Sequence, residues 1–102
     1  MAKGYWIAHV DVHSADGYQL YTKDLLNIFK QHGGRYLMRA GDFEVMEGTC
    51  RSRNVVIEFP SYEAALACYR SAAYQQAAAH RKASADADLI VLKGYDGPQP
   101  GD

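Results

Sequence analysis

Two segments in which apolar and polar side chains alternate with the period of a β-strand constrain the fold most strongly. They cover residues 4–12 and residues 53–59. Every second side chain of a strand lies on the same face of its sheet. One face of these strands therefore carries the apolar residues Trp6, Ala8, Val10, Val12, Val55, Ile57 and Phe59. We expect helices to cover this face, because an apolar sheet face is buried against another layer.

Helical periodicity predicts that covering layer. Apolar residues recur every three or four positions over residues 15–32, between an N-cap at Ser14 and the glycine pair at 33–34. Pro60 ends the second strand and Ser61 caps a second helix. Ser71 is expected to cap a third, alanine-rich helix that continues to residue 85.

The remaining segments complete a mixed α+β chain. Residues 35–40 and 88–95 predict two further strands, and residues 43–48 predict a hairpin arm that follows a turn at 41–42. A polar connection covers residues 49–52. The order β-α-β-β-α-β predicts the ferredoxin-like plan, an antiparallel sheet with both helical regions on one face. We expect one domain over residues 1–96 and a flexible tail, rich in proline and glycine, over residues 97–102.

The composition excludes several classes of function. The chain has 102 residues, and eleven basic against twelve acidic residues leave a formal charge of −1, which argues against a strongly cationic nucleic-acid-binding protein. The longest apolar run has four residues, Leu89–Leu92, and the start of the sequence lacks an apolar signal core. We therefore expect a cytoplasmic protein with Cys50 and Cys68 reduced, and no nucleic-acid or membrane partner.

The second face of the predicted sheet points to a partner subunit. It carries Tyr5, Ile7 and Val56, with either Leu89 and Val91 or Ile90 and Leu92 from the last strand. The same face carries the polar residues His9, Asp11, Arg39, Asn54 and Glu58. This mixed surface predicts a homodimer in which a second sheet packs on the first and leaves a partly polar space for a small molecule. A monomer with a solvated sheet face is the alternative.

Three blocks of sequence resemble a known bacterial family. They are Gly4-Tyr5-Trp6-Ile7-Ala8, Gly33-Gly34-Arg35-Tyr36-Leu37 and Arg51-Ser52-Arg53-Asn54-Val55-Val56-Ile57-Glu58-Phe59-Pro60-Ser61. Together with Cys68-Tyr69, Ser71, Tyr74 and Arg81, they are similar to the family known as domain of unknown function 1330 over residues 3–96. Ala72-Ala73 departs from the Pro-Glu that similar sequences often carry. The resemblance implies the dimeric α/β-barrel superfamily and no particular reaction.

The candidate catalytic residues are His9, Asp11 and Arg39. His9 and Asp11 stand two positions apart on one strand, so a carboxylate can orient an imidazole that acts as a general base. Arg39 is expected to point away from the helices, if Tyr36 and Met38 point toward them, and to clamp a carboxylate or enolate. The alternatives are an interfacial hydrogen-bonding pair for His9 and Asp11, and a structural ion bridge for Arg39.

Further polar and aromatic residues are candidate ligand contacts. They are Asn54, Glu58, Tyr69, Tyr74 and Arg81. Asn54 could orient a carbonyl group or a water molecule, and Arg53 is expected at the rim of the pocket. Tyrosines at helical spacing are more often core residues, which is the alternative for Tyr69 and Tyr74. We expect no metal and no cofactor, because the spacing of His and Cys fits no metal site.

The function predicted from the sequence is that of a homodimeric α/β-barrel protein that binds a small molecule between its sheets, with no assigned reaction. The alternative is a cofactor-independent enzyme of the oxygenase or isomerase type, acting on a small aromatic or enolisable substrate. A purely structural or interaction module is a third possibility.

Overall fold

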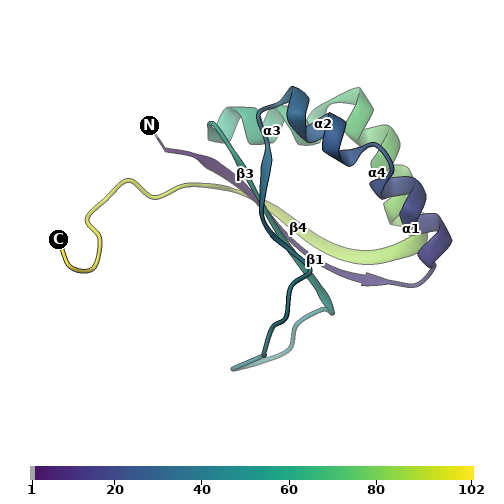
Figure 1. Cartoon of the computed structure of the whole chain (residues 1–102), viewed down its shortest axis with the longest axis horizontal. Coiled ribbons are helices and arrows are strands. Elements are labelled where there is room, and N and C mark those ends of the chain that lie inside the picture. Colours follow the sequence, from purple (N-terminus) through teal and green to yellow (C-terminus); the bar gives the residue numbers. More distant parts are fainter. Residues whose placement is uncertain (1) are drawn as a thin grey trace.

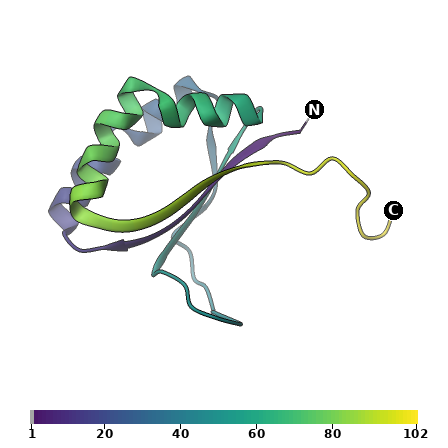
Figure 2. The ribbon, with the colours of Figure 1, turned by 180° about the vertical axis from the view of Figure 1, so that it is seen from behind.

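The fold was obtained as a computed structural model, which describes residues 2–102, and it is ferredoxin-like α+β (Figure 1). One antiparallel sheet carries all the helices on one face (Figure 1, Figure 2). The elements are β1 (Gly4–Val12), α1 (Ala15–Thr22), α2 (Leu25–Gln31), β2 (Arg35–Arg39), β3 (Arg53–Phe59), α3 (Tyr62–Arg70), α4 (Ala72–Ser84) and β4 (Ala85–Lys93). The fold class predicted from the strand and helix order is confirmed.

The sheet has the strand order β2-β3-β1-β4. Antiparallel pairing sets Trp6 opposite Ile57 on β3 and opposite Val91 on β4, so these three side chains share the helix-covered face. On β4 the apolar residues of the uncovered face are Ile90 and Leu92, about half exposed, which decides between the two alternatives left open by the sequence. We call this uncovered side the open face.

The core is centred on Trp6, which is 1% exposed. Its indole N–H donates a hydrogen bond to the carbonyl oxygen of Ala65 at 2.8 Å, which ties β1 to α3. Aromatic rings surround it edge-on or tilted, with centroids 4.7 to 5.8 Å away; they belong to Phe29, Phe59, Tyr69 and Tyr74. Edge-to-face pairs of this kind add to the free energy gained by burying the rings.

The helical layer is broken in two places. The backbone departs from helical dihedral angles at Asp24, so the single helix expected over residues 15–32 is instead α1 followed by α2. The break allows Tyr21 of α1 and Leu25 of α2 to be buried over the same twisted sheet. The second break falls at Ser71, which caps α4 by accepting a hydrogen bond from the backbone N–H of Tyr74, as the sequence predicted.

The segment between β2 and β3 differs from the prediction. Residues 43–48 form no strand, and residues 40–52 make one long loop that projects from the sheet (Figure 1). At Ala40, which has a φ of 55°, the chain turns away from the sheet. The segment over residues 43–48 therefore does not pair with β2, and the expected hairpin does not form. Its apolar residues Phe43, Val45 and Met46 are exposed instead.

Two further features concern the ends of the chain. β4 begins at Ala85, three residues earlier than expected, because it pairs with β1 as far as Val12. After Lys93 the described chain forms neither helix nor strand. Within residues 2–102 there is no helix with the length and apolar character needed to cross a membrane.

Candidate functional site

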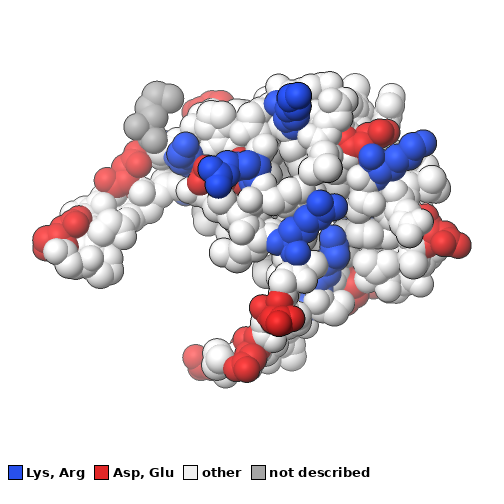
Figure 3. Space-filling model, viewed as in Figure 1, with Lys and Arg blue, Asp and Glu red and all other residues white. Residues whose placement is uncertain are grey.

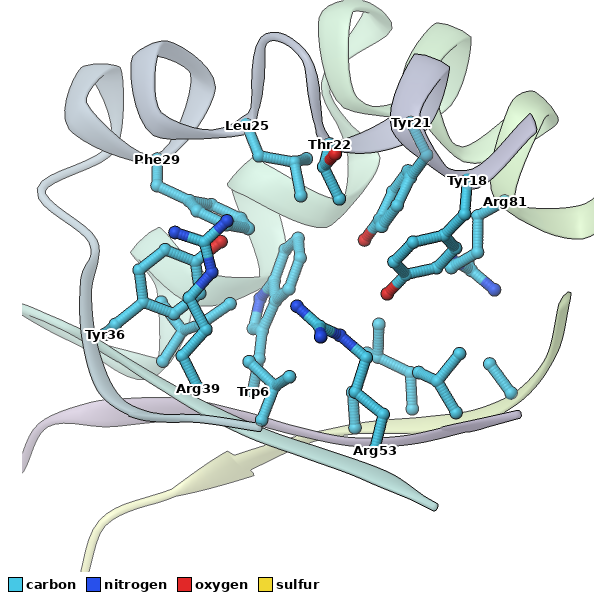
Figure 4. Close-up of a pocket in the computed structure, with 16 residues that line it drawn as sticks. Trp6, Tyr18, Tyr21, Thr22, Leu25, Phe29, Tyr36, Arg39, Arg53 and Arg81 are labelled. Carbon is cyan, nitrogen blue, oxygen red and sulfur yellow. The ribbon is translucent and has the colours of Figure 1, made fainter. Parts of the chain in front are cut away.

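A cavity lies between the sheet and the helices, on the covered face (Figure 4). Trp6 forms its floor, and Tyr18, Tyr21, Phe29 and Tyr36 form aromatic walls. The cavity is narrow, since the space open to the centre of a water molecule is about 30 Å³, room for a few waters. A larger ligand therefore requires the side chains at its mouth to move.

Three arginines reach this cavity from three different elements. Arg39 comes from the end of β2, Arg53 from the start of β3 and Arg81 from α4. Each guanidinium lies over a tyrosine ring. The distances from guanidinium carbon to ring centroid are 4.6 Å for Arg39 over Tyr36, 5.6 Å for Arg53 over Tyr18 and 5.6 Å for Arg81 over Tyr21. Cation–π contacts of this kind hold the guanidiniums without neutralising them.

The orientation expected for Arg39 is wrong, and a β-bulge is the reason. Tyr36 pairs with Ile57 and Met38 pairs with Val56, so Leu37 is an extra residue on β2. The extra residue reverses the alternation of faces after it. Arg39 therefore shares the covered face with Tyr36, and Met38 is exposed on the other side.

The charges around the cavity are all of one sign. No Asp or Glu lines it in the part of the chain that the structure describes. The Nε atoms of Arg53 and Arg81 are buried and have no hydrogen-bond partner among residues 2–102. Arg81 as a whole is only 7% exposed. A buried cation without a counter-ion costs free energy, so the empty cavity favours an anion. On the outer surface, Figure 3 shows basic side chains gathered between the helical layer and the projecting loop.

Two tyrosine hydroxyls form a buried pair beside the cavity. The Tyr21 and Tyr74 oxygens lie 2.8 Å apart. Burial raises the pKa of both phenols, so both stay protonated at neutral pH. Tyr21 lines the cavity, whereas Tyr74 and Tyr69 pack against Trp6 behind it. The ligand role of Tyr69 and Tyr74 stays a prediction, and their observed position is in the core.

The other predicted residues lie on the open face. The Nδ1 atom of His9 contacts the Asn54 amide oxygen, and the Cys50 thiol donates a hydrogen bond to the same oxygen at 3.1 Å. Glu58 accepts a weak hydrogen bond from the Tyr5 hydroxyl at 3.4 Å and lies 3.9 Å from the Lys3 ammonium. This face therefore carries polar groups that already have partners.

Asp11 is held by the end of the loop rather than by His9. Its carboxylate accepts hydrogen bonds from the backbone N–H and the hydroxyl of Ser52, and from Arg51, which also binds Asp88. The backbone N–H of Ser52 is the main reason that the pKa of Asp11 lies below its usual value. His9 and Asp11 are therefore not joined by a hydrogen bond, and Arg39 is on the opposite face from both. The catalytic roles of the three stay predictions.

Neither location holds a group that resembles a metal site. Among the described residues there is no cluster of three His, Cys, Asp or Glu side chains that could hold a metal ion. Tyr18, Tyr21 and Tyr36 line the cavity although the sequence did not predict them there, and Arg53 was expected only at the rim. Arg53 is in phase with the apolar residues Val55, Ile57 and Phe59 of its strand, and that alternation was the signal that could have placed it inside.

Fold and cavity together define a ferredoxin-like α+β protein with an arginine-lined cavity between its sheet and its helices. The family model for Domain of unknown function (DUF1330) matches residues 3–95, so the chain belongs to this family. The resemblance noted from the sequence is thereby confirmed. No curated protein matches the sequence.

Solved structures share the fold. A protein of unknown function from Rhodopseudomonas palustris is 24% identical, with a TM-score of 0.73 over 94% of this chain and 85% of that one. SnoaB, a cofactor-independent oxygenase from Streptomyces nogalater, is 11% identical, with a TM-score of 0.64 over 95% and 97%. A Bacteroides thetaiotaomicron protein described as a possible oxidoreductase is 14% identical, with a TM-score of 0.59 over 90% and 97%. At these identities the likeness concerns the fold and no reaction.

Proposed function

We propose that this protein binds a small anionic molecule with an aromatic or otherwise flat body in the cavity between its sheet and its helices. The observation that carries the proposal is the set of three arginines around an apolar cavity that, among residues 2–102, no acidic residue lines. Two of them, Arg53 and Arg81, have buried Nε atoms without a hydrogen-bond partner in the described part of the chain. A bound carboxylate or enolate would supply the missing acceptor through charge-assisted hydrogen bonds.

The aromatic walls support the second half of the proposal. The rings of Trp6, Phe29 and Tyr36 offer flat, rigid contact area around the cavity. Ligand sites are typically apolar clefts with a few convergent polar groups, which fits this cavity better than the open face. We therefore assign the ligand to the interior of one protomer rather than to the space between two sheets that the sequence suggested.

A thermal-shift comparison of acids with neutral analogues tests the proposal. Benzoate in excess should raise the melting temperature by mass action, and benzamide, which is uncharged and of the same shape, should not. Arg53→Gln should abolish the benzoate shift. Arg70→Gln, an exposed arginine outside the cavity, is the matched control and should keep it. Equal shifts from benzamide and benzoate, or no shift from a panel of aromatic acids, would contradict the proposal.

A cofactor-independent enzyme is the second candidate. The fold shared with SnoaB supports it, and so does the protonated Tyr21 hydroxyl, because donors and cations aimed into an apolar cavity stabilise a developing oxyanion. Oxygen uptake with hydroquinones would detect an oxygenase, and exchange of α-protons for deuterium in ketones, followed by NMR, would detect an isomerase. If the unaltered protein and Arg53→Gln gave equal rates in both assays, the enzyme would be removed as a candidate.

We further propose that two copies pair through their open faces, and that the protein is cytoplasmic, as the sequence predicts. Exposed Met38, Ile90 and Leu92 support this arrangement, because apolar side chains on one uncovered sheet face favour a partner surface. Light scattering should give twice the monomer mass of 11.3 kDa. Ile90→Glu should give the monomer with an unchanged circular dichroism spectrum. A monomeric unaltered protein at micromolar concentration would contradict the pairing.

A further inference from the structure

We infer that the ligand carries two acidic groups, one for each end of the cavity. This inference rests on the proposed function, because it specifies which class of anion the cavity binds. Arg39 and Arg81 stand at opposite ends of the cavity, and Arg53 lies between them (Figure 4).

The sheet supplies two arginines that act on one end together. Arg39 pairs with Val55 across β2 and β3, and Arg53 lies two residues before Val55 on the same face. Diagonal neighbours on adjacent strands have Cα atoms roughly 7–8 Å apart, which is within the reach of two long side chains for one acceptor. Arg39 is exposed and can reorient at the mouth, whereas the Nε atom of Arg53 is fully buried. The pair therefore suits an acidic group that enters at this end.

The helices supply a second cationic point. Arg81 projects from α4, is 7% exposed and has an Nε atom without a partner among residues 2–102. The guanidinium lies beside Tyr21, whose hydroxyl also faces the cavity (Figure 4). When Tyr74 donates to Tyr21, the Tyr21 hydroxyl is free to donate into the cavity. An acidic group at this end would therefore meet a buried cation and a neutral donor.

The region between the two ends is apolar and aromatic. It is bounded by Trp6 and Phe29, which can contact the faces and edges of a flat body but cannot neutralise charge. A ligand with one negative charge, held between Arg39 and Arg53, would leave the buried Arg81 guanidinium without a counter-ion. A dianion with its charges at opposite ends would place its second charge beside Arg81.

Isothermal titration with two ligands built on the same para-substituted ring tests this inference. Terephthalate carries a carboxylate at each end of its ring, and monomethyl terephthalate carries only one. The unaltered protein should bind terephthalate at least about tenfold more tightly. Arg81→Gln should reduce this ratio to about twofold or less and should leave the affinity for the monoester nearly unchanged. Arg39→Gln, at the other end, should weaken both ligands by a similar factor.

The outcomes separate this inference from the function on which it rests. Equal affinities for the two ligands in the unaltered protein would overturn the two-group inference and leave anion binding intact. Failure of both ligands and of benzoate to bind would overturn the proposed function itself. Should Arg81→Gln fail to fold, the salt dependence in the unaltered protein decides the question. Affinity for terephthalate should fall more steeply with added salt than affinity for the monoester, and equal slopes would overturn the inference.

Discussion

The two faces of the sheet use polar residues in opposite ways. On the open face, Asp11 binds Ser52 and Arg51, and His9 contacts Asn54, so each group has a partner within the chain. On the covered face, the buried Nε atoms of Arg53 and Arg81 have no hydrogen-bond partner among the residues that the structure describes. A polar group with partners stabilises the fold by itself, whereas a buried group without one is stabilised only when something binds. The candidate ligand site is therefore on the covered face, although the open face carries more kinds of polar side chain.

The largest difference between the faces should appear in stability. Trp6→Ala removes the ring at the centre of the core and should lower the free energy of unfolding by about 3–5 kcal/mol. Ile90→Ala, on the open face and 54% exposed, should cost less than about 1 kcal/mol in dilute protein. Urea unfolding followed by circular dichroism measures both. Tryptophan fluorescence would not serve, because Trp6 is the only tryptophan and the Trp6→Ala variant lacks it. A cost for Ile90→Ala that matches Trp6→Ala would show that both faces are equally buried.

The buried hydroxyl pair should give the next largest effect. Tyr21→Phe leaves the Tyr74 hydroxyl buried without its partner and should cost about 1–3 kcal/mol. Tyr21→Phe with Tyr74→Phe removes both polar groups, so the double variant should lose less than the sum of the two single variants. Chemical unfolding of the three variants measures the coupling. Strict additivity would mean that the two hydroxyls do not interact.

The sequence predicted the faces of the sheet better than it predicted the site. Alternation in β1 and β3 placed Trp6 and Ile57 correctly, because burial imposes a strict period of two on regular strands. The same rule failed for Arg39, because the bulge at Leu37 reverses the faces and no residue type marks it. Local patterns also could not show that Asp11 would be bound by Ser52, forty-one residues away in the chain. That contact depends on how β1 and the loop meet in space.

Arg53→Met should increase the stability of the folded protein, whereas most substitutions decrease it. It removes a guanidinium without a counter-ion and leaves an apolar chain of similar length, so it should stabilise the ligand-free protein by about 1 kcal/mol. Arg70→Met, at an exposed position, is the control and should change stability by less than about 0.5 kcal/mol. Thermal unfolding without ligand measures both. A loss of stability in Arg53→Met would mean that the stacking of Arg53 on Tyr18 stabilises the fold more than its partly buried charge destabilises it.

The smallest expected effect is the contribution of Asp11, on the open face, to the pH dependence of the protein's stability. Its pKa in the folded protein is lower than the ordinary value of 3.8, because the Ser52 backbone N–H and the neighbouring donors favour the carboxylate. A group with a lowered folded pKa contributes stability that is present above the unfolded pKa and is lost as the pH falls through the folded pKa. The unaltered protein should therefore exceed Asp11→Asn in stability at pH 7, and the gap should close below pH 3.8. Urea midpoints of the two proteins between pH 7 and pH 2 measure the gap. A difference in stability that stays constant over this range would mean that the hydrogen bonds from Ser52 to residue 11 stabilise the fold equally with or without the charge of Asp11.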